Sequence, residues 1–205
     1  MSAPIDPPAG HYFEPSPASA SAEEVVEVRL PDLAFSLRTD RGVFSHGHLD
    51  AGTAVLLRAA PPPPPTGVGL DLGCGAGPIA LAMALRAPGL RVWAVDVNER
   101  ARDLCAANAR DNGVAVTVAA PDVVPADLRF DVIWSNPPIR VGKAALHELL
   151  LTWLSRLAPG GRAVLVVHKH LGADSLHRWL DEQGYPTQRL ASSKGYRILD
   201  VHPHR

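Results

Sequence analysis

Three alternating glycines follow an apolar run in the segment GLDLGCGAGPIAL, residues 69–81. They are Gly73, Gly75 and Gly77, and glycine lets a backbone turn sharply and lets a ligand approach it without an intervening side chain. Asp71 adds a carboxylate just before them, where it could hold a ligand's ammonium group and would repel a pyrophosphate. The dinucleotide-binding pattern needs Gly or Ala where this sequence has Pro78, so NAD fits badly. A ligand that carries an ammonium group fits better.

A second carboxylate lies at the end of the next apolar run, VWAVDVN, residues 92–98. Asp96 would stand at the tip of the neighbouring strand, where a carboxylate can accept hydrogen bonds from both hydroxyls of a ribose. An ordinary helix cap is the alternative, and Asn98 could do that job equally well. We expect Asp96 to bind a nucleoside and leave the cap as the competing interpretation.

The segment FDVIWSNPPIRVGK, residues 130–143, carries the third candidate site. Each of the two prolines locks φ and removes an N–H, so the carbonyls of Asn136 and Pro137 should face outward with no local donor. The Asn136 side-chain oxygen and a proline carbonyl could accept both hydrogens of a planar NH₂ group. This would aim the nitrogen lone pair at a methyl carbon, so that catalysis is mostly positioning and electrostatics. No metal is required, and the paired histidines (His46 with His48, His168 with His170) are interpreted as loop and strand-end residues.

Strand and helix patterns alternate regularly around these motifs. Apolar runs predict strands at 67–71, 91–96, 115–119, 130–135, 162–168, 187–191 and 196–201, and amphipathic segments predict helices at 78–87, 99–112, 143–157 and 173–183. This order indicates an α/β fold with a Rossmann-like, seven-stranded, mostly parallel sheet covered on both faces. The last two strands should form an antiparallel hairpin at one edge. In such sheets the ligand binds at the carboxyl ends of the strands.

The residues before this core divide into three parts. Residues 1–24 are rich in Pro, Ala and Ser and indicate a flexible arm, whose HYF cluster at 11–13 could fold back over a cleft. Residues 25–60 predict an accessory hairpin and a short helix capped by Asp50. Residues 61–66 predict a proline-rich spacer. The core would then occupy residues 67–205.

Composition limits the protein class. A chain of 205 residues with 46% hydrophobic residues fits one folded domain. The net charge of −1 argues against a wholly basic nucleic-acid protein, yet residues 151–205 hold eight Lys+Arg against four Asp+Glu. The longest uncharged run, 72–85, is shorter than the ~20 residues that a bilayer requires. The N-terminus does not look like a signal peptide and the two cysteines form no framework, so we expect a cytoplasmic protein.

The motifs together resemble a known family. Acid-x-Gly-x-Gly-x-Gly resembles the first motif of the class I S-adenosylmethionine-dependent methyltransferases. The order of motifs resembles the "methyltransferase small" family, which includes small-subunit ribosomal RNA guanine-N2 methyltransferases of the RsmC type. The motifs concerned are GVFSHGHLDAGTAVLL (42–57), DLGCGAGPIAL (71–81), VDVNERA (95–101), NPPIRVGK (136–143) and APGGRAVLVV (158–167). The resemblance covers residues 28–201.

The resemblance implies S-adenosyl-L-methionine as the cofactor and ribosomal RNA or the small ribosomal subunit as the partner. The residues implied at the cofactor are the glycine-rich turn with Asp71, Asp96 and Asn98, Asn136, Asp122 at the adenine amine, and Phe44, Asp50 and Gly52 closing over the site. For Asp122 an ordinary turn is the alternative, because PDVVPAD is also a good turn sequence. The guanine amine would be held by Asn136, Pro137 and Pro138.

Ile139 departs from the family pattern, because many amine methyltransferases place Phe or Tyr there to stack on the base. Arg140 and Lys143 would contact phosphates at the mouth of the site. The chain is also too short for the second domain of the best-known ribosomal members. Two other functions stay open. One is methylation of a glutamine amide in a protein, although enzymes of that group usually have the motif NPPY and this chain has Ile139 in place of the tyrosine. The other is a non-catalytic domain that binds the cofactor.

Overall fold

The computed structural model describes residues 23–40, 43 and 47–203. The HYF cluster, Phe44 and His46 lie outside these residues, so the expectations attached to them stay expectations.

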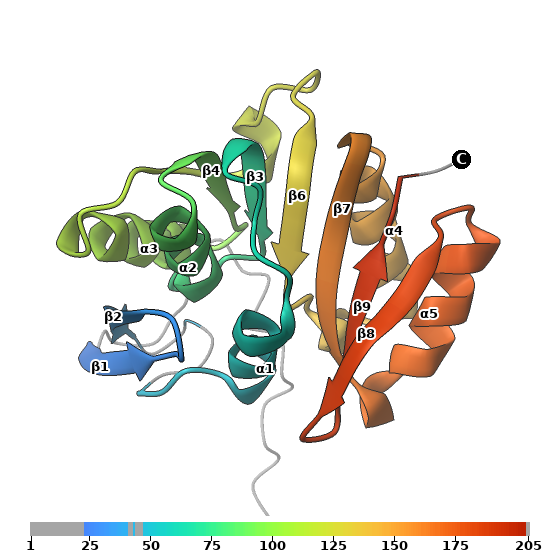
Figure 1. The fold of residues 1–205 in the computed structure, drawn as a ribbon, viewed down its shortest axis with the longest axis horizontal. Helices are drawn as coiled ribbons and strands as arrows, with labels where there is room; N and C mark the ends of the chain where they lie inside the picture. Colours follow the sequence, from blue (N-terminus) through green and yellow to red (C-terminus); the bar gives the residue numbers. More distant parts are fainter. Residues whose placement is uncertain (1–22, 41–42, 44–46, 204–205) are drawn as a thin grey trace, which may run out of the picture.

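A seven-stranded sheet forms the centre of the fold (Figure 1). Its strands are β3 (Thr66–Leu72), β4 (Gly89–Val95), β5 (Val116–Ala119), β6 (Phe130–Ser135), β7 (Leu157–His168), β8 (Thr187–Ser193) and β9 (Tyr196–Val201), in the spatial order β5-β4-β3-β6-β7-β9-β8. Strand β9 pairs antiparallel with both of its neighbours, and the other neighbouring strands of this sheet pair parallel. The expected α/β sheet is therefore confirmed, and its C-terminal hairpin places β8 at the edge.

Five α-helices lie among the described residues: α1 (Ala51–Ala59), α2 (Pro78–Arg86), α3 (Glu99–Asp111), α4 (Lys143–Leu154) and α5 (Ala173–Glu182). Short 3-10 turns occur at η1 (Pro121–Val123), η2 (Ile139–Val141) and η3 (Lys169–Leu171). Local sequence explains the starts of two helices: Asp50 caps α1 by accepting from Thr53 N–H, and Asn98 caps α3 by accepting from Ala101 N–H. Helix α4 stops at Leu154, three residues before the predicted end, because β7 begins at Leu157, where Leu157 pairs with Phe130.

The two faces of the sheet are buried under different helices, as Figure 1 shows for α2 and α3 on one side and α4 and α5 on the other. Strand β7 alternates between them: Val164 and Val166 pack in the cluster with α1, α2 and α3, whereas Leu165 and Val167 pack in the cluster with α4 and α5. A sheet that is covered on both faces needs such continuously apolar strands.

An N-terminal hairpin of β1 (Glu24–Arg29) and β2 (Ala34–Thr39) lies beside α3. Its Val28, Phe35 and Leu37 belong to the same apolar cluster as α1, α2 and α3. The prolines 61–65 join α1 to β3. The hairpin and α1 thus share a hydrophobic core with the sheet.

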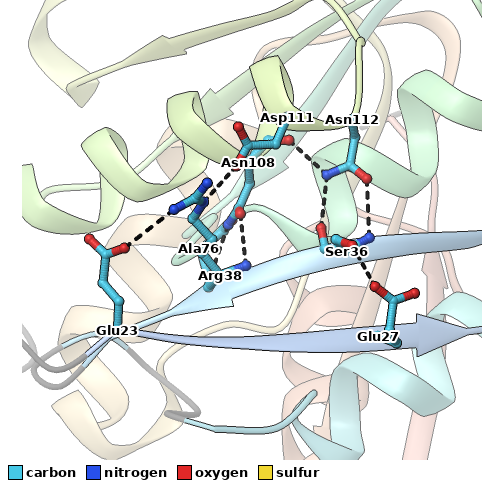
Figure 2. A network of polar contacts seen from close by, with 8 residues as sticks. All are labelled: Glu23, Glu27, Ser36, Arg38, Ala76, Asn108, Asp111 and Asn112. Atoms are coloured by element: carbon cyan, nitrogen blue, oxygen red, sulfur yellow. Dashed lines mark hydrogen bonds and ion pairs between the residues drawn. The ribbon is translucent and has the colours of Figure 1, made fainter.

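Asn108 of α3 and Asn112, which caps the C-terminus of that helix, hold the hairpin by its backbone (Figure 2). Asn108 Oδ1 accepts from Arg38 N–H at 2.8 Å and its Nδ2 donates to the Arg38 carbonyl at 2.9 Å. Asn112 makes the same pair of bonds with Ser36, at 3.1 and 2.8 Å. Since the two asparagines are one helical turn apart and the two partners are two residues apart on β2, the carboxamides continue the hydrogen bonding of the strand edge.

Candidate active site

A cleft opens where the N-terminal elements meet the carboxyl ends of β3 and β6. Figure 1 shows β6 pointing toward α1. The lining residues come from three places, namely the hairpin with the segment into α1, the glycine-rich turn, and the end of β6. They are Leu37, Thr39, His48, Leu49, Asp50 and Thr53; Gly73, Cys74, Gly75, Ala76, Pro78 and Ile79; and Asn136.

The glycine-rich turn is open at two of its three glycines. Gly73 and Gly75 have φ of +74° and +52°, and a Cβ at either would meet nothing within 4 Å. Gly77 also has a positive φ, but a Cβ there would collide with Cys105 Sγ of α3. Gly73 and Gly75 therefore form a cradle that a ligand can approach closely, whereas Gly77 is required by the packing of the turn against α3.

Asp71 lies beneath this turn and is fully buried. Its Oδ2 accepts from Ala80 N–H at 2.9 Å, while its Oδ1 is buried and has no partner within the described part of the chain. Burial raises the pKa of Asp71 to about 8, against the lowering effect of the Ala80 hydrogen bond. A buried carboxyl oxygen without a donor is costly, and a cationic ligand above the turn would supply the missing charge.

Asp96 holds the same turn from the neighbouring strand. Its Oδ2 accepts from Gly75 N–H at 2.9 Å and its Oδ1 accepts from Asn98 N–H at 2.9 Å. Burial raises its pKa, and the two backbone hydrogen bonds oppose that shift. Asn98 caps α3, so the capping role expected as an alternative for Asp96 belongs to Asn98. The Asp96 carboxylate is buried under the turn, and neither Asp96 nor Asp71 is among the lining residues of the cleft. Asp122 is exposed in η1 and is not among the lining residues of the cleft.

Asn136 is anchored by the N-terminal elements. Its Nδ2 donates to Asp50 Oδ2 at 2.7 Å and to Thr53 Oγ1 at 3.1 Å. Both N–H bonds of the amide are thereby used, which leaves Oδ1 as the acceptor that the side chain offers. Thr53 was not among the predicted site residues, since nothing local to the segment DAGT links it to a residue at the end of β6.

The two prolines after Asn136 form a turn that differs from the expectation. The Pro137 carbonyl accepts from Ile139 N–H at 2.9 Å, so the prediction that it has no local donor is wrong. The cause lies in the first residue after the prolines, which has an N–H and turns back over Pro137 as η2 begins. A carbonyl oxygen has two lone pairs, so the Pro137 oxygen can still accept a second hydrogen bond.

The remaining candidate residues lie around this centre. Arg140 and Lys143 are exposed, in η2 and at the start of α4. Gly52 is buried, and a Cβ there would lie 2.8 Å from the Tyr196 ring, so glycine is required at that point by packing between α1 and β9. Burial and the nearby Asp50 raise the pKa of Tyr196.

Neither a metal centre nor a membrane span is found in the described ranges. No group of three or more His, Cys, Asp or Glu side chains there is arranged to hold a metal ion. Among the same residues, no helix has the length and apolar composition needed to cross a bilayer.

The family model for the methyltransferase small domain matches residues 34–200. The chain belongs to this family. Membership confirms the enzyme class expected from the sequence, an S-adenosylmethionine-dependent methyltransferase. The match includes β2, α1, the glycine-rich turn and Asn136, so all three parts of the cleft are family elements.

Methyltransferase small relatives fall into two size groups. The uncharacterized protein YbxB of Bacillus subtilis is 33% identical over 92% of this chain and 96% of its own length. Ribosomal RNA small subunit methyltransferase C of Chromohalobacter salexigens is 32% identical over 89% of this chain and 56% of its own. The same enzyme of Pseudomonas aeruginosa is 37% identical over 78% and 48%. The chain spans nearly all of YbxB and about half of the two ribosomal enzymes.

Solved structures confirm the fold. The T. thermophilus 16S rRNA N2 G1207 methyltransferase (RsmC), solved in complex with AdoMet and guanosine, superposes with a TM-score of 0.76 at 25% identity. The alignment covers 92% of this chain and 52% of that one. A methyltransferase of Pyrococcus furiosus shares the fold at a TM-score of 0.58.

Proposed function

We propose that this enzyme transfers the methyl group of S-adenosylmethionine to the exocyclic N2 amine of a guanine in small-subunit (16S) ribosomal RNA. The observation that carries the proposal is the orientation of Asn136, whose amide nitrogen is bound to Asp50 and Thr53 and whose oxygen is left as an acceptor in the cleft. An acceptor oxygen is what an amine N–H requires. The names and bound guanosine of the RsmC relatives support the choice of acceptor.

The residues around the cleft fit the cofactor. Gly73 and Gly75 offer an open cradle, Asp71 Oδ1 offers a buried oxygen without a partner among the described residues, and Asp96 would offer its remaining lone pairs to ribose hydroxyls. When bound, S-adenosylmethionine supplies an electrophilic methyl group.

The chain's own part in the reaction is to place the amine. Asn136 Oδ1 accepts one amine N–H, and the second lone pair of the Pro137 carbonyl accepts the other. Holding both hydrogens in one plane directs the nitrogen lone pair toward the methyl group, which is positioning rather than acid-base catalysis. Ile139 supplies an apolar wall beside the base. Exposed Arg140 and Lys143 are placed to contact the phosphates of the RNA.

The proposal is tested by tritiated methyl transfer to small ribosomal subunits, naked ribosomal RNA and a release-factor protein in parallel. Asn136→Ala should keep cofactor affinity within about twofold and lower turnover by ~10²–10³, as removal of one preorganised polar contact does. Gln188→Ala, exposed on the edge strand β8, is the matched control and should behave as wild type. If only the release-factor protein were labelled, the methyl acceptor would be a glutamine amide and not a guanine. Equal turnover of the Asn136→Ala and wild-type enzymes would refute the role of Asn136.

A further inference from the structure

The N-cap residue and the first turn of α1 bind the side chain of Asn136 through two hydrogen bonds. Asp50 Oδ2 lies 2.7 Å from Asn136 Nδ2, and Thr53 Oγ1 lies 3.1 Å from the same nitrogen. These residues come from opposite ends of the cleft-forming sequence, since α1 precedes the whole sheet and Asn136 follows its central strand β6. The contact is a tertiary one.

This pair of bonds decides which way the Asn136 amide faces. An ionised carboxylate only accepts hydrogen bonds, so the atom of Asn136 that faces Asp50 must be the nitrogen. Rotation of the amide by half a turn would bring its oxygen against the carboxylate and present its NH₂ to the cleft. A substrate amine would then meet a donor in place of an acceptor, and methyl transfer would lose its positioning contact.

The platform beneath the two residues is rigid. Asp50 Oδ2 also accepts from Thr53 N–H at 2.8 Å, so the residue that caps α1 is the one that holds Asn136. Thr53 is 4% exposed, and Val55, Leu56 and Leu57 of the same helix are buried in the core. The ring of Tyr196 on β9 packs beside Gly52, so closely that a Cβ at this position would lie 2.8 Å from it. A fixed acceptor pair on a packed helix is what positioning of a reacting group requires.

We propose that Asp50 and Thr53 are positioning residues that lock the Asn136 amide with its oxygen toward the methyl acceptor. The inference rests on the proposed function of Asn136 and gives Asp50 a different job from closing over the cofactor. Asp50 acts through Asn136, and its removal should lower kcat while the cofactor dissociation constant stays within about twofold.

A swap of the two side chains is the sharpest test. Asn136→Asp alone sets two carboxylates against each other at the place where 2.7 Å now separates a donor from an acceptor, and kcat should fall by ~10²-fold or more. Asp50→Asn alone loses the acceptor-only partner but keeps a good helix cap, and kcat should fall by roughly tenfold. The double variant restores one donor and one acceptor in reversed order. It should recover kcat at least tenfold over Asn136→Asp.

Thr53 is tested with a conservative pair. Thr53→Val removes the hydroxyl but keeps the backbone N–H that Asp50 caps, and kcat should fall several-fold. Thr53→Ser keeps the hydroxyl and should retain most of the activity. Equal kcat in the valine and serine variants would overturn the role of Thr53. A double swap no more active than Asn136→Asp, or Asp50→Asn raising the cofactor dissociation constant with kcat unchanged, would overturn the role of Asp50.

A second readout separates this inference from the choice of substrate. The chain has only four asparagines, Asn98, Asn108, Asn112 and Asn136, so ¹⁵N-asparagine labelling gives four side-chain NH₂ pairs, and Asn136→Ala identifies one of them. Asp50→Ala and Thr53→Val should each shift the Asn136 pair and speed its hydrogen exchange at least several-fold. If the wild type labels no ribosomal RNA but these shifts occur, the RNA proposal fails and the anchoring of Asn136 stands. Unchanged resonances would refute the anchoring itself.

Discussion

Asn108 of α3 is the residue through which the hairpin and the glycine-rich turn are joined. Its side chain is fully buried and bonds three backbone groups: Arg38 N–H, Arg38 C=O and, through Nδ2 at 2.8 Å, Ala76 C=O. Asn108→Ala leaves all three without their partner, as Figure 2 makes clear. Each buried group left unpaired costs about 1–3 kcal/mol. Because Arg38 is only half-buried, we take the lower end for each group and expect a loss of about 3 kcal/mol in the free energy of unfolding.

Urea and thermal unfolding measure this loss. A loss of about 3 kcal/mol corresponds to a drop of roughly 6–12 °C in Tm for a chain of this size. Asn112→Ala is the matched control, because it removes a similar pair of bonds to Ser36 from a half-buried position where water can replace them, and it should cost about 1 kcal/mol. If the two variants unfold within a few tenths of a kcal/mol of each other, the buried link to Ala76 does not hold the hairpin. Cofactor affinity should also fall in Asn108→Ala, since Leu37 and Thr39 of β2 line the cleft.

Three further predictions concern the cofactor side of the cleft. Asp96→Ala should raise the dissociation constant of S-adenosylmethionine, measured by calorimetry, by one to two decades, because hydrogen bonds to a charged acceptor contribute ~1.5–3 kcal/mol each. An unchanged dissociation constant would mean that Asp96 only holds the Gly75 backbone. Calorimetry should likewise detect S-adenosylhomocysteine and not NAD, and tight NAD binding would sink the cofactor assignment. Asp71 has a folded pKa of about 8, above its unfolded value, so its contribution to stability is full below about pH 4 and is lost as pH rises through 8. Between pH 5 and 8 this loss lowers the free energy of unfolding of the wild type by up to about 1.4 kcal/mol per pH unit, and Asp71→Asn should abolish that slope. Urea titrations at several pH values measure it, and equal slopes for the two proteins would contradict the raised pKa.

The sheet was predictable because its signals are local. The apolar runs that form β3, β4 and β6 and the cap at Asn98 are each contained in a few consecutive residues, and alternation of strands and helices then restricts the topology. Strand β7 is longer than its prediction, since the segment before Gly161 pairs as well: a Cβ at that glycine would lie 2.8 Å from the Phe130 carbonyl. That close approach depends on the partner strand β6, so no pattern in residues 157–161 predicts it.

The site was predictable only in its residue types. The sequence pointed to Gly77 as part of the ligand cradle, but its neighbour is Cys105, which α3 brings from a distant part of the chain. It pointed to Asn136 without the two residues that orient it, since Asp50 and Thr53 precede the sheet. Spacing identifies groups that can do chemistry, whereas contacts between separate elements decide which atom of each group is free to do it.

Asparagine side chains join the N-terminal elements to the rest of the fold at two points. Asn108 bonds β2 to the glycine-rich turn, and Asn136 bonds the end of β6 to α1. The cleft is lined both by the hairpin, through Thr39, and by the glycine-rich turn, through Gly75. A ligand that contacts both walls stabilises the joined state by about 2.7 kcal/mol at a concentration of 100 times its Kd. If the cofactor binds in this cleft, we expect its binding and the docking of the hairpin to be linked, so that each carboxamide that strengthens docking also strengthens cofactor binding.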